Sequence, residues 1–379
     1  MQKGKKMIKN IRKALFVIYV LFFRLPMWTI IWLVGLTGVI KTIFLIYPTD
    51  RKEYADLSPD FKFLRKFMSG RPTPAGVIFD KWKPVGIYLF ISNTPQELIK
   101  KKNRHIAEAI ARRMRWIQRL SGAEACGFAG QLGPILEKRH GIAMEPPFYS
   151  STMGCIFSID DSISFLAKSL GKRPWQLSIA LIGGGELGGM LHEHFTNQGY
   201  KTDVVDVTIK RRGGIKVTDI EATGRQLDHA DFVINLLPTG EDFLSCGTAD
   251  LLKPSTSVID FSRPAIPKEK LQAKIYMGNR VQRTGLRFAF ALPGWHQKEL
   301  PACSMPSILA SIHGIVEQNL TKFCMSARRV AFQTSLAAAV QPAPKPLLTR
   351  LQLLGNEFMM NCHFYLFVAR NNYTYARVK

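Results

Sequence analysis

Three glycines follow a short apolar run near the middle of the chain. The run, Leu177–Ile182, ends in Gly183-x-Gly185-x-x-Gly188 and passes directly into a helix-like segment. Gly183 permits a tight turn, Gly185 lets a pyrophosphate approach the backbone, and Gly188 lets the helix pack close to the strand. This order of strand, turn and helix predicts the first unit of a dinucleotide-binding fold, and a purely structural glycine turn is the alternative.

The cofactor phosphates are expected on the N–H groups at the start of this helix, which include those of Glu186 and Leu187. A second strand, 202–207, carries Asp206 about 20 residues after the glycines, where an acid binds a ribose 2′-hydroxyl. A polar and basic cluster follows at once: Thr208, Lys210, Arg211 and Arg212. Because such a cluster suits a 2′-phosphate, NADPH is favoured, and NADH is the alternative.

Two later strands also end in polar residues. The strand 231–237 stops at Pro238, and the strand 256–261 ends near Asp260. In open α/β sheets the ligand lies beyond the carboxyl ends of the strands. The predicted cofactor site therefore also contains Leu237, Pro238 and Thr239.

A cysteine beyond the sheet could act as a nucleophile. Cys303 directly precedes a helix-like segment, with His296 and Lys298 nearby. A helix N-terminus and cationic neighbours favour the thiolate, which could take an acyl group from a thioester for reduction by a nicotinamide. His296 could then donate a proton to the alkoxide. The alternatives are an inert buried cysteine and a surface histidine.

The other reactive side chains support weaker predictions. Cys126 and Cys155 also lie in loops near glycines and are secondary candidates for the nucleophile. His192 and His194 are two residues apart, so they point to different sides of a helix and no metal site is predicted.

A series of short motifs resembles the long-chain acyl-(acyl-carrier-protein) reductases of the cyanobacterial type, over about residues 112–312. The motifs are Cys126-Gly-Phe-Ala-Gly130, Tyr149-Ser-Ser-Thr152, Ala167-Lys-Ser-Leu-Gly171, the glycine turn, Asp228-His-Ala-Asp-Phe-Val233, Leu252-Lys-Pro-Ser-Thr-Ser-Val-Ile-Asp260 and Pro301-Ala-Cys-Ser-Met-Pro-Ser-Ile-Leu-Ala310. The resemblance implies NADPH-dependent reduction of a long-chain acyl thioester, carried by acyl carrier protein or coenzyme A, to a fatty aldehyde. It places the nucleophile on Cys303.

From Leu177 onward, strand and helix candidates alternate, which predicts βαβ units and a parallel sheet. The expected fold is α/β, a Rossmann-like doubly wound parallel sheet with a second α/β substrate domain and an N-terminal hydrophobic membrane segment. The expected divisions are a basic and membrane segment at 1–50, a substrate domain at 51–174, the Rossmann domain at 175–300, a helical segment with the nucleophile at 301–340 and a tail of unknown role at 341–379.

The membrane prediction rests on a basic start, residues 1–13, followed by an apolar stretch, Ala14–Tyr47. The stretch exceeds the ~20 residues that one helix needs to span a bilayer. It fits either one span near 25–46 or a bent interfacial pair. Because nicotinamide cofactors are cytosolic and basic residues flank both ends, we favour the second, at the cytoplasmic face of a membrane. A buried soluble helix is the alternative.

The charge balance favours anionic partners, since 52 Lys and Arg against 28 Asp and Glu give +24. A basic helix at 98–120 would suit an acidic acyl carrier protein or lipid headgroups. Zinc-type spacings and RNA-binding aromatic motifs are missing, so nucleic acid is not expected. Two rival functions remain: a dehydrogenase of a small amino, keto or hydroxy acid, and a non-catalytic dinucleotide-sensing membrane protein. The oligomeric state stays open.

Overall fold

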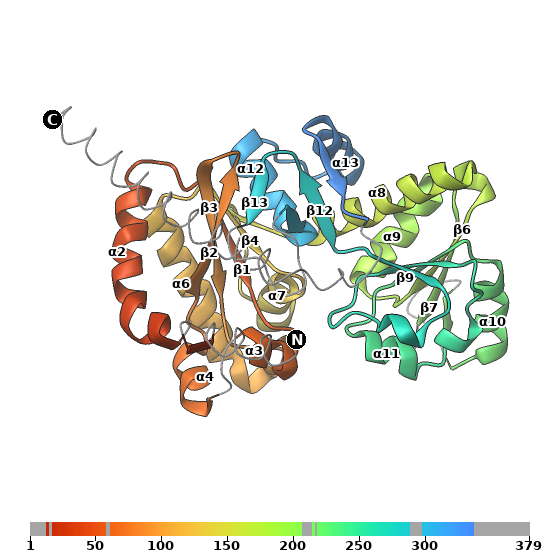
Figure 1. The fold of residues 1–379 in the computed structure, drawn as a ribbon, viewed down its shortest axis with the longest axis horizontal. Coiled ribbons are helices and arrows are strands. Elements are labelled where there is room, and N and C mark those ends of the chain that lie inside the picture. Colours follow the sequence, from red (N-terminus) through yellow and green to blue (C-terminus); the bar gives the residue numbers. More distant parts are fainter. Residues whose placement is uncertain are drawn as a thin grey trace, which may run out of the picture. The chain divides into compact units, whose positions relative to one another are not determined.

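The chain divides into two compact units. The computed structural model describes residues 13–14, 17–57, 61–206, 214–216, 218–288 and 298–336. Of the described residues, the first unit takes those up to Ser151 and those from Arg283 to Ala327, and the second takes those from Thr152 to Gln282 and from Arg328 onward (Figure 1). The boundary thus follows Ser151 rather than residue 174, and residues 17–50 share a unit with the predicted substrate domain. The predicted tail lies outside the described residues.

The second unit is built on a parallel sheet. Its strands are β6 (Ser178–Ile182), β7 (Lys201–Asp206), β8 (Ile215–Lys216), β9 (Phe232–Asn235), β10 (Ser257–Asp260) and β11 (Lys274–Met277). They are arranged β11-β10-β9-β6-β7-β8, with each neighbouring pair parallel. Counted from β6 as the first strand, this is the doubly wound Rossmann order. The predicted α/β fold class is confirmed for this unit.

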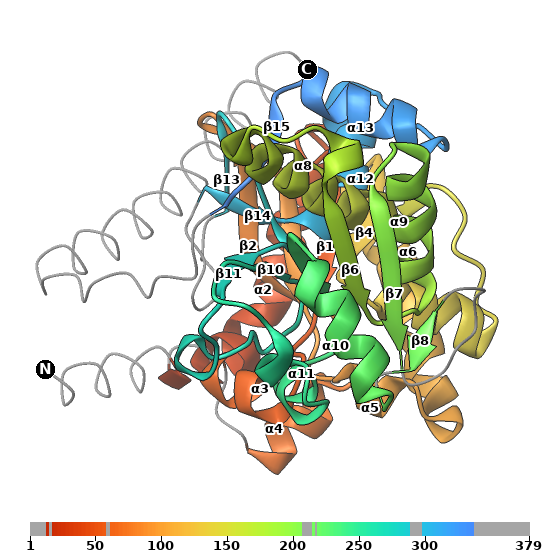
Figure 2. The ribbon, with the colours of Figure 1, turned by 90° about the vertical axis from the view of Figure 1, so that its right-hand side faces the viewer.

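Helices connect these strands, as a parallel sheet requires. They are α8 (Thr152–Leu170), η4 (Pro174–Gln176), α9 (Glu186–Asn197), α10 (Ile220–His229), α11 (Gly240–Ser245), η5 (Ala249–Leu251) and η6 (Lys268–Lys270). Figure 2 shows α9 and α10 beside β6 and β7. Beyond the sheet, β12 (Arg280–Arg283) lies next to β15 (Phe332–Thr334), and the Ser335 N–H donates to the Arg280 carbonyl over 3.0 Å.

The first unit contains a mixed sheet in the order β13-β2-β3-β1-β4-β5. Its strands are β1 (Thr42–Ile46), β2 (Thr73–Asp80), β3 (Lys83–Phe90), β4 (Ala125–Phe128), β5 (Phe148–Tyr149) and β13 (Leu286–Phe288), and β14 (Glu299–Pro301) follows in the chain. The strands β3, β1, β4 and β5 are parallel, and β2 runs antiparallel to β3 and β13. The helices are η1 (Tyr19–Phe23), α2 (Arg24–Gly35), α3 (Arg51–Leu57), α4 (Lys62–Met68), α5 (Pro95–Leu98), η2 (Lys101–Asn103), α6 (Arg104–Ser121), α7 (Leu132–Pro134), η3 (Ile135–Arg139), η7 (Ala302–Ser304) and α12 (Met305–His313), with α13 (Leu320–Arg329) ending in the second unit.

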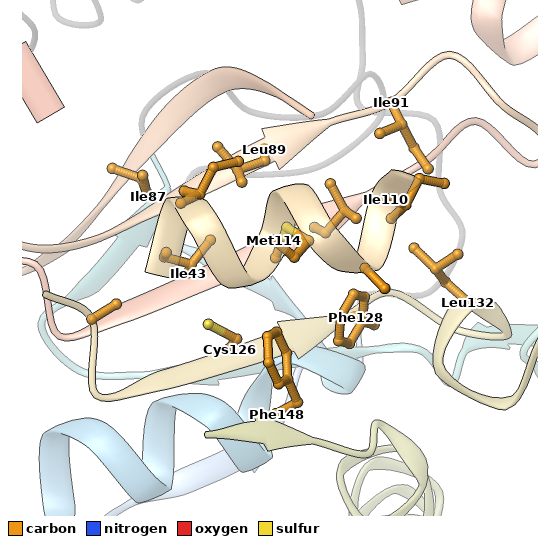
Figure 3. Close-up of a cluster of buried hydrophobic side chains, with 14 of the residues drawn as sticks. Ile43, Ile87, Leu89, Ile91, Ile110, Met114, Cys126, Phe128, Leu132 and Phe148 are labelled. Atoms are coloured by element: carbon orange, nitrogen blue, oxygen red, sulfur yellow. The ribbon is translucent and has the colours of Figure 1, made fainter. Parts of the chain in front are cut away.

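Part of the apolar N-terminal stretch forms an inner strand of this sheet. All five residues of β1 are buried, and the strand pairs in parallel with β3 and β4. Figure 3 shows Ile43 in the same cluster as Ile110 and Met114 of α6. A strand buried on both faces needs a continuous apolar run, and its composition resembles that of a membrane segment. The prediction of a membrane segment is therefore wrong for residues 42–46.

The helical part of the stretch, α2, packs beside α6 through Ile31 and Val34. Among the described residues, the structure contains no helix with the length and apolar character needed to cross a membrane.

A buried carboxylate ties together helices of the second unit. Asp160 of α8 pairs with His194 of α9 at 3.1 Å, accepts a hydrogen bond from Gln198 at 3.1 Å and forms an ion pair with Arg328. Burial raises the pKa of Asp160, but the hydrogen bond from His194 and the charge of Arg328 outweigh it, so the pKa is lowered.

We expect Asp160→Asn to lower the free energy of unfolding by about 2 kcal/mol, less than for a fully buried pair because Arg328 is 41% exposed. The stabilisation by the Asp160 carboxylate is fully present above the pKa of an unfolded Asp, about 3.9. It is lost as pH falls through the lower pKa that Asp160 has in the folded state. Urea unfolding from neutral to acidic pH measures this dependence. The variant should lose less stability than the parent in the acid range, and equal losses would contradict the assignment.

Candidate functional site

The glycine turn has the close packing that its spacing predicts. Gly183 follows β6 with φ +112°, a conformation that L side chains rarely adopt. A Cβ on Gly188 would lie 2.0 Å from the Gly183 carbonyl oxygen, so α9 rests directly on the turn. Only glycine permits this approach of helix to strand.

The start of α9 is open to a ligand. Its N-cap, Gly185, contributes no side-chain hydrogen bond, and a Cβ built on it would meet nothing within 4 Å. Gly185 and Glu186 are exposed, and Leu187 is half-buried. Because the first N–H groups of a helix have no partner within the helix, this end offers donors to an anion.

The predicted acid lies beside the turn. Asp206 is the last residue of β7, and its Oδ2 accepts a hydrogen bond from the Gly184 N–H at 2.6 Å. A Cβ on Gly184 would lie 2.8 Å from the same oxygen, so the glycine lets the carboxylate approach. The basic cluster predicted after it, with Thr208, Lys210 and Arg211, falls outside the described residues.

A buried carboxylate and amide fix the ends of β9 and β10. Asp260 accepts hydrogen bonds from Asn235 Nδ2 at 2.9 Å, from the Ser262 hydroxyl at 2.6 Å and from the Ile266 N–H at 2.7 Å. Burial raises the pKa of Asp260, against the lowering effect of these donors. Asn235 in turn accepts from the Leu237 N–H at 3.1 Å. This role of Asn235 was not predicted from the sequence: its position at the end of a strand is a local signal for a polar site, but its partner Asp260 lies 25 residues away.

The loops after β9 and β10 are joined by backbone hydrogen bonds. The Gly240 N–H donates to the Pro264 carbonyl at 2.8 Å, and the Arg263 N–H donates to the Pro238 carbonyl at 3.1 Å. A Cβ on Gly240 would lie 2.4 Å from the Ile266 nitrogen. This packing fixes Leu237, Pro238 and Thr239, and Thr239 also caps α11.

The carboxyl edge of this one sheet thus gathers the glycine turn, Asp206 and the loop 237–239. The turn follows β6, which lies between β7 and β9, so the strand order reverses at this point. Ligands of open α/β sheets bind at such a switch point. The individual binding roles of these residues stay predictions.

The candidate nucleophile lies on the first unit. Cys303 is half-buried on η7, directly before α12, which packs on β1 and β4. The approach of α12 is close, because a Cβ on Gly127 would lie 2.7 Å from Ser307 Oγ. His296 falls outside the described residues.

The two secondary candidates for the nucleophile are buried. Cys126 is buried in β4, where desolvation raises its pKa strongly, and Cys155 is buried in α8. Burial of this kind disfavours the reactive thiolate.

No protein-family model matches the sequence, and no curated protein matches it. Solved structures do match. L-tryptophan dehydrogenase from Nostoc punctiforme is 15% identical over 77% of this chain and 80% of that chain, with a TM-score of 0.39. Shikimate 5-dehydrogenase from Listeria monocytogenes, in complex with shikimate and NAD, is 12% identical over 76% and 96%, with a TM-score of 0.36.

A D-isomer specific 2-hydroxyacid dehydrogenase from Xanthobacter autotrophicus Py2, in complex with NADPH and MES, is 17% identical over 29% of this chain, with a TM-score of 0.22. The chain spans 53% of the length of that protein. The cofactor prediction, NADPH with NADH as the alternative, agrees with the dinucleotides named for these neighbours.

The prediction of an acyl thioester reductase is contradicted by these matches, which are dehydrogenases of a hydroxy acid, an amino acid and shikimate. The motifs behind that prediction have ordinary structural positions. The first, at Cys126, is the inner strand β4, and those ending at Val233 and Asp260 mark the strands β9 and β10. β4 belongs to the sheet of the first unit, and β9 and β10 belong to the sheet of the second. Parallel sheets of any function need such buried strands, so these motifs do not identify the reaction.

We expect Gly185→Ala to leave the fold intact, because its Cβ meets open space, and to weaken dinucleotide binding about tenfold or more by obstructing the pyrophosphate. Gly188→Ala should instead lower the free energy of unfolding by about 2 kcal/mol or more, since its Cβ overlaps a backbone oxygen. Fluorescence titration with NADPH and NADH, together with thermal unfolding, measures both effects.

Gly224→Ala is the matched control, because its Cβ would lie 3.7 Å from Leu251 in the same unit. It should keep cofactor affinity and gain about 0.5–1 kcal/mol of stability in a helix interior. Unchanged affinity in Gly185→Ala would place the dinucleotide elsewhere.

Proposed function

We propose that this protein is an NAD(P)-dependent dehydrogenase of a small amino, keto or hydroxy acid. One observation carries the proposal: a glycine turn with an open helix start lies at the switch point of a Rossmann-ordered sheet, beside Asp206.

The residues present fit a dinucleotide. The space at Gly185 suits the pyrophosphate, and the N–H groups at the start of α9 would hold it. Asp206 would accept a hydrogen bond from the adenosine ribose, and the loop 237–239 would lie along the cofactor. When bound, the nicotinamide supplies hydride transfer. These side chains position the cofactor and take no part in the bond changes.

The net charge of +24 supports an anionic substrate, because a positive field attracts carboxylates. A dinucleotide-sensing protein without turnover is the second candidate, and the same open helix start would serve it. Turnover distinguishes the two.

The test is oxidation of NADPH and NADH by the purified full-length protein with a set of 2-oxo acids and 3-dehydroshikimate, with and without ammonium. We expect absorbance of the reduced nicotinamide to fall with at least one acid, and to fall far more slowly in Gly185→Ala. Cofactor binding without turnover across the whole set would favour the sensing protein.

Cys303→Ala should retain the rate of the parent within about twofold, because hydride transfer to a carbonyl needs no thiol nucleophile. The measurement is the same assay, together with a long-chain acyl thioester as substrate. Loss of acid reduction in Cys303→Ala would place the thiol in the chemistry. Aldehyde formation from the thioester by the parent would overturn the proposed substrate class.

Asp206→Ser should shift the cofactor preference toward NADPH. We expect the ratio of the dissociation constants for NADH and NADPH to rise by about tenfold. Removing the carboxylate takes away an acceptor for the NADH ribose and a repulsive charge against the 2′-phosphate. Fluorescence titration with both cofactors measures the ratio. A ratio equal to that of the parent would exclude Asp206 from the ribose site.

A further inference from the structure

Helix α2 and the turn η1 before it are apolar on both faces. The inner face packs into the core of the first unit through Met27, Ile31 and Val34. The outer face presents a row spaced three or four residues apart, which we call the outer stripe: Phe22, Leu25, Thr29, Trp32 and Leu36. The exposed fractions of its large members are 70% for Phe22, 78% for Leu25, 45% for Trp32 and 63% for Leu36.

An ordinary surface helix carries polar or charged residues on its outer face. Here the sequence from residue 14 to residue 40 has a single charged residue, Arg24, and its guanidinium stacks over Phe67 at 5.5 Å. The outer stripe therefore exposes four large apolar side chains, interrupted only by Thr29, to water. Such a surface typically marks contact with a partner or a lipid phase.

The neighbourhood of the outer stripe is basic. Helix α6 lies beside α2 on the same side of the sheet, and Trp28 contacts Trp116 edge to face at 5.6 Å (Figure 1). Along its exposed side α6 carries an arginine row: Arg112, Arg115 and Arg119. The first 49 residues of the chain contain no Asp or Glu.

The outer stripe and the arginine row together indicate what kind of partner this surface binds. An apolar row next to cations, with tryptophans at their boundary, is typical of helices that lie in the interface of an anionic bilayer. A second copy of this chain would bring two arginine rows together in a protein of net charge +24, and like charge opposes that contact.

We propose that the first unit binds an anionic membrane surface through the outer stripe and the arginine row. Because the inner face of α2 is packed on the core, the helix enters the headgroup region from one side and stays part of the protein. This inference is independent of the proposed dehydrogenase activity.

The test is co-sedimentation of the full chain with vesicles of phosphatidylcholine containing phosphatidylglycerol, and with vesicles of phosphatidylcholine alone. We expect binding to the anionic vesicles, weakened by salt because the attraction is partly electrostatic. The triple variant Phe22→Ser, Leu25→Ser, Trp32→Ser should bind at least about tenfold more weakly, from its loss of buried apolar area.

The second unit offers a matched control with the same three residue types. Phe165, Leu170 and Trp175 are 60%, 50% and 56% exposed, and replacing them with serine should leave vesicle binding unchanged. The variant Arg112→Gln, Arg115→Gln, Arg119→Gln should lose the preference for anionic vesicles. Its charge control is Lys168→Gln, Lys201→Gln, Lys274→Gln, from exposed positions of the second unit. Circular dichroism and thermal unfolding of every variant report folding.

Three results would overturn the proposal: no vesicle binding by the parent, equal binding to neutral and anionic vesicles, or equal binding by the stripe variant and its control. A dimer of the parent that the stripe variant abolishes, seen by light scattering without vesicle binding, would assign the stripe to self-association instead.

Discussion

Burial of parallel strands on both of their faces determines how each unit is built. The inner strands β1 and β6 are paired on both edges and enclosed by buried side chains. Their interiors, Ile43–Ile46 and Ile179–Ile182, are entirely apolar, because an unpaired polar group there would lose its hydration without compensation. Polar chemistry is therefore confined to the strand ends. The glycine turn, Asp206 and the pair of Asn235 and Asp260 all lie at the carboxyl ends of strands.

Polar groups at these ends need partners of their own, and this need shapes the site. Asp260 is buried and would be costly without donors, so the loop after β10 folds back to supply them. Asn235 links that carboxylate to the loop after β9. Gly240 then lets the two loops touch. Among the described residues of this edge, Gly185 at the start of α9 has open space beside it.

The sequence allowed much of the second unit to be predicted, because its signals are local. The strand expected at 177–182 is β6 at 178–182, and the strand expected at 202–207 is β7 at 201–206. Gly183 and Gly188 have the packing roles that their spacing indicates. The position of Asp206 beside the turn also follows from its distance along the chain.

The first unit was harder to predict, because its determinants are not local. Nothing in Ile43–Ile46 distinguishes a strand between two partners from the end of a membrane segment, since both are continuously apolar. The role of Asn235 was missed because it depends on a partner 25 residues away. The function was misjudged for a related reason. Motifs such as the one at Cys126 coincide with buried parallel strands, whose apolar composition follows from burial whatever the reaction.

Burial in the sheet accounts for only part of the apolar N-terminal stretch. It explains the apolar residues Ile43–Ile46 of β1, and it explains the inner face of α2, where Ile31 and Val34 fill the core. It does not require Leu25 or Trp32, since serine or lysine at these exposed positions would leave the core intact. A row of such residues along one helix face, unlike scattered exposed ones, is typical of a contact with a partner or a lipid phase. The lack of any acid before Asp50 and the arginine row on α6 are the two charge features on which the proposed contact with an anionic lipid surface rests.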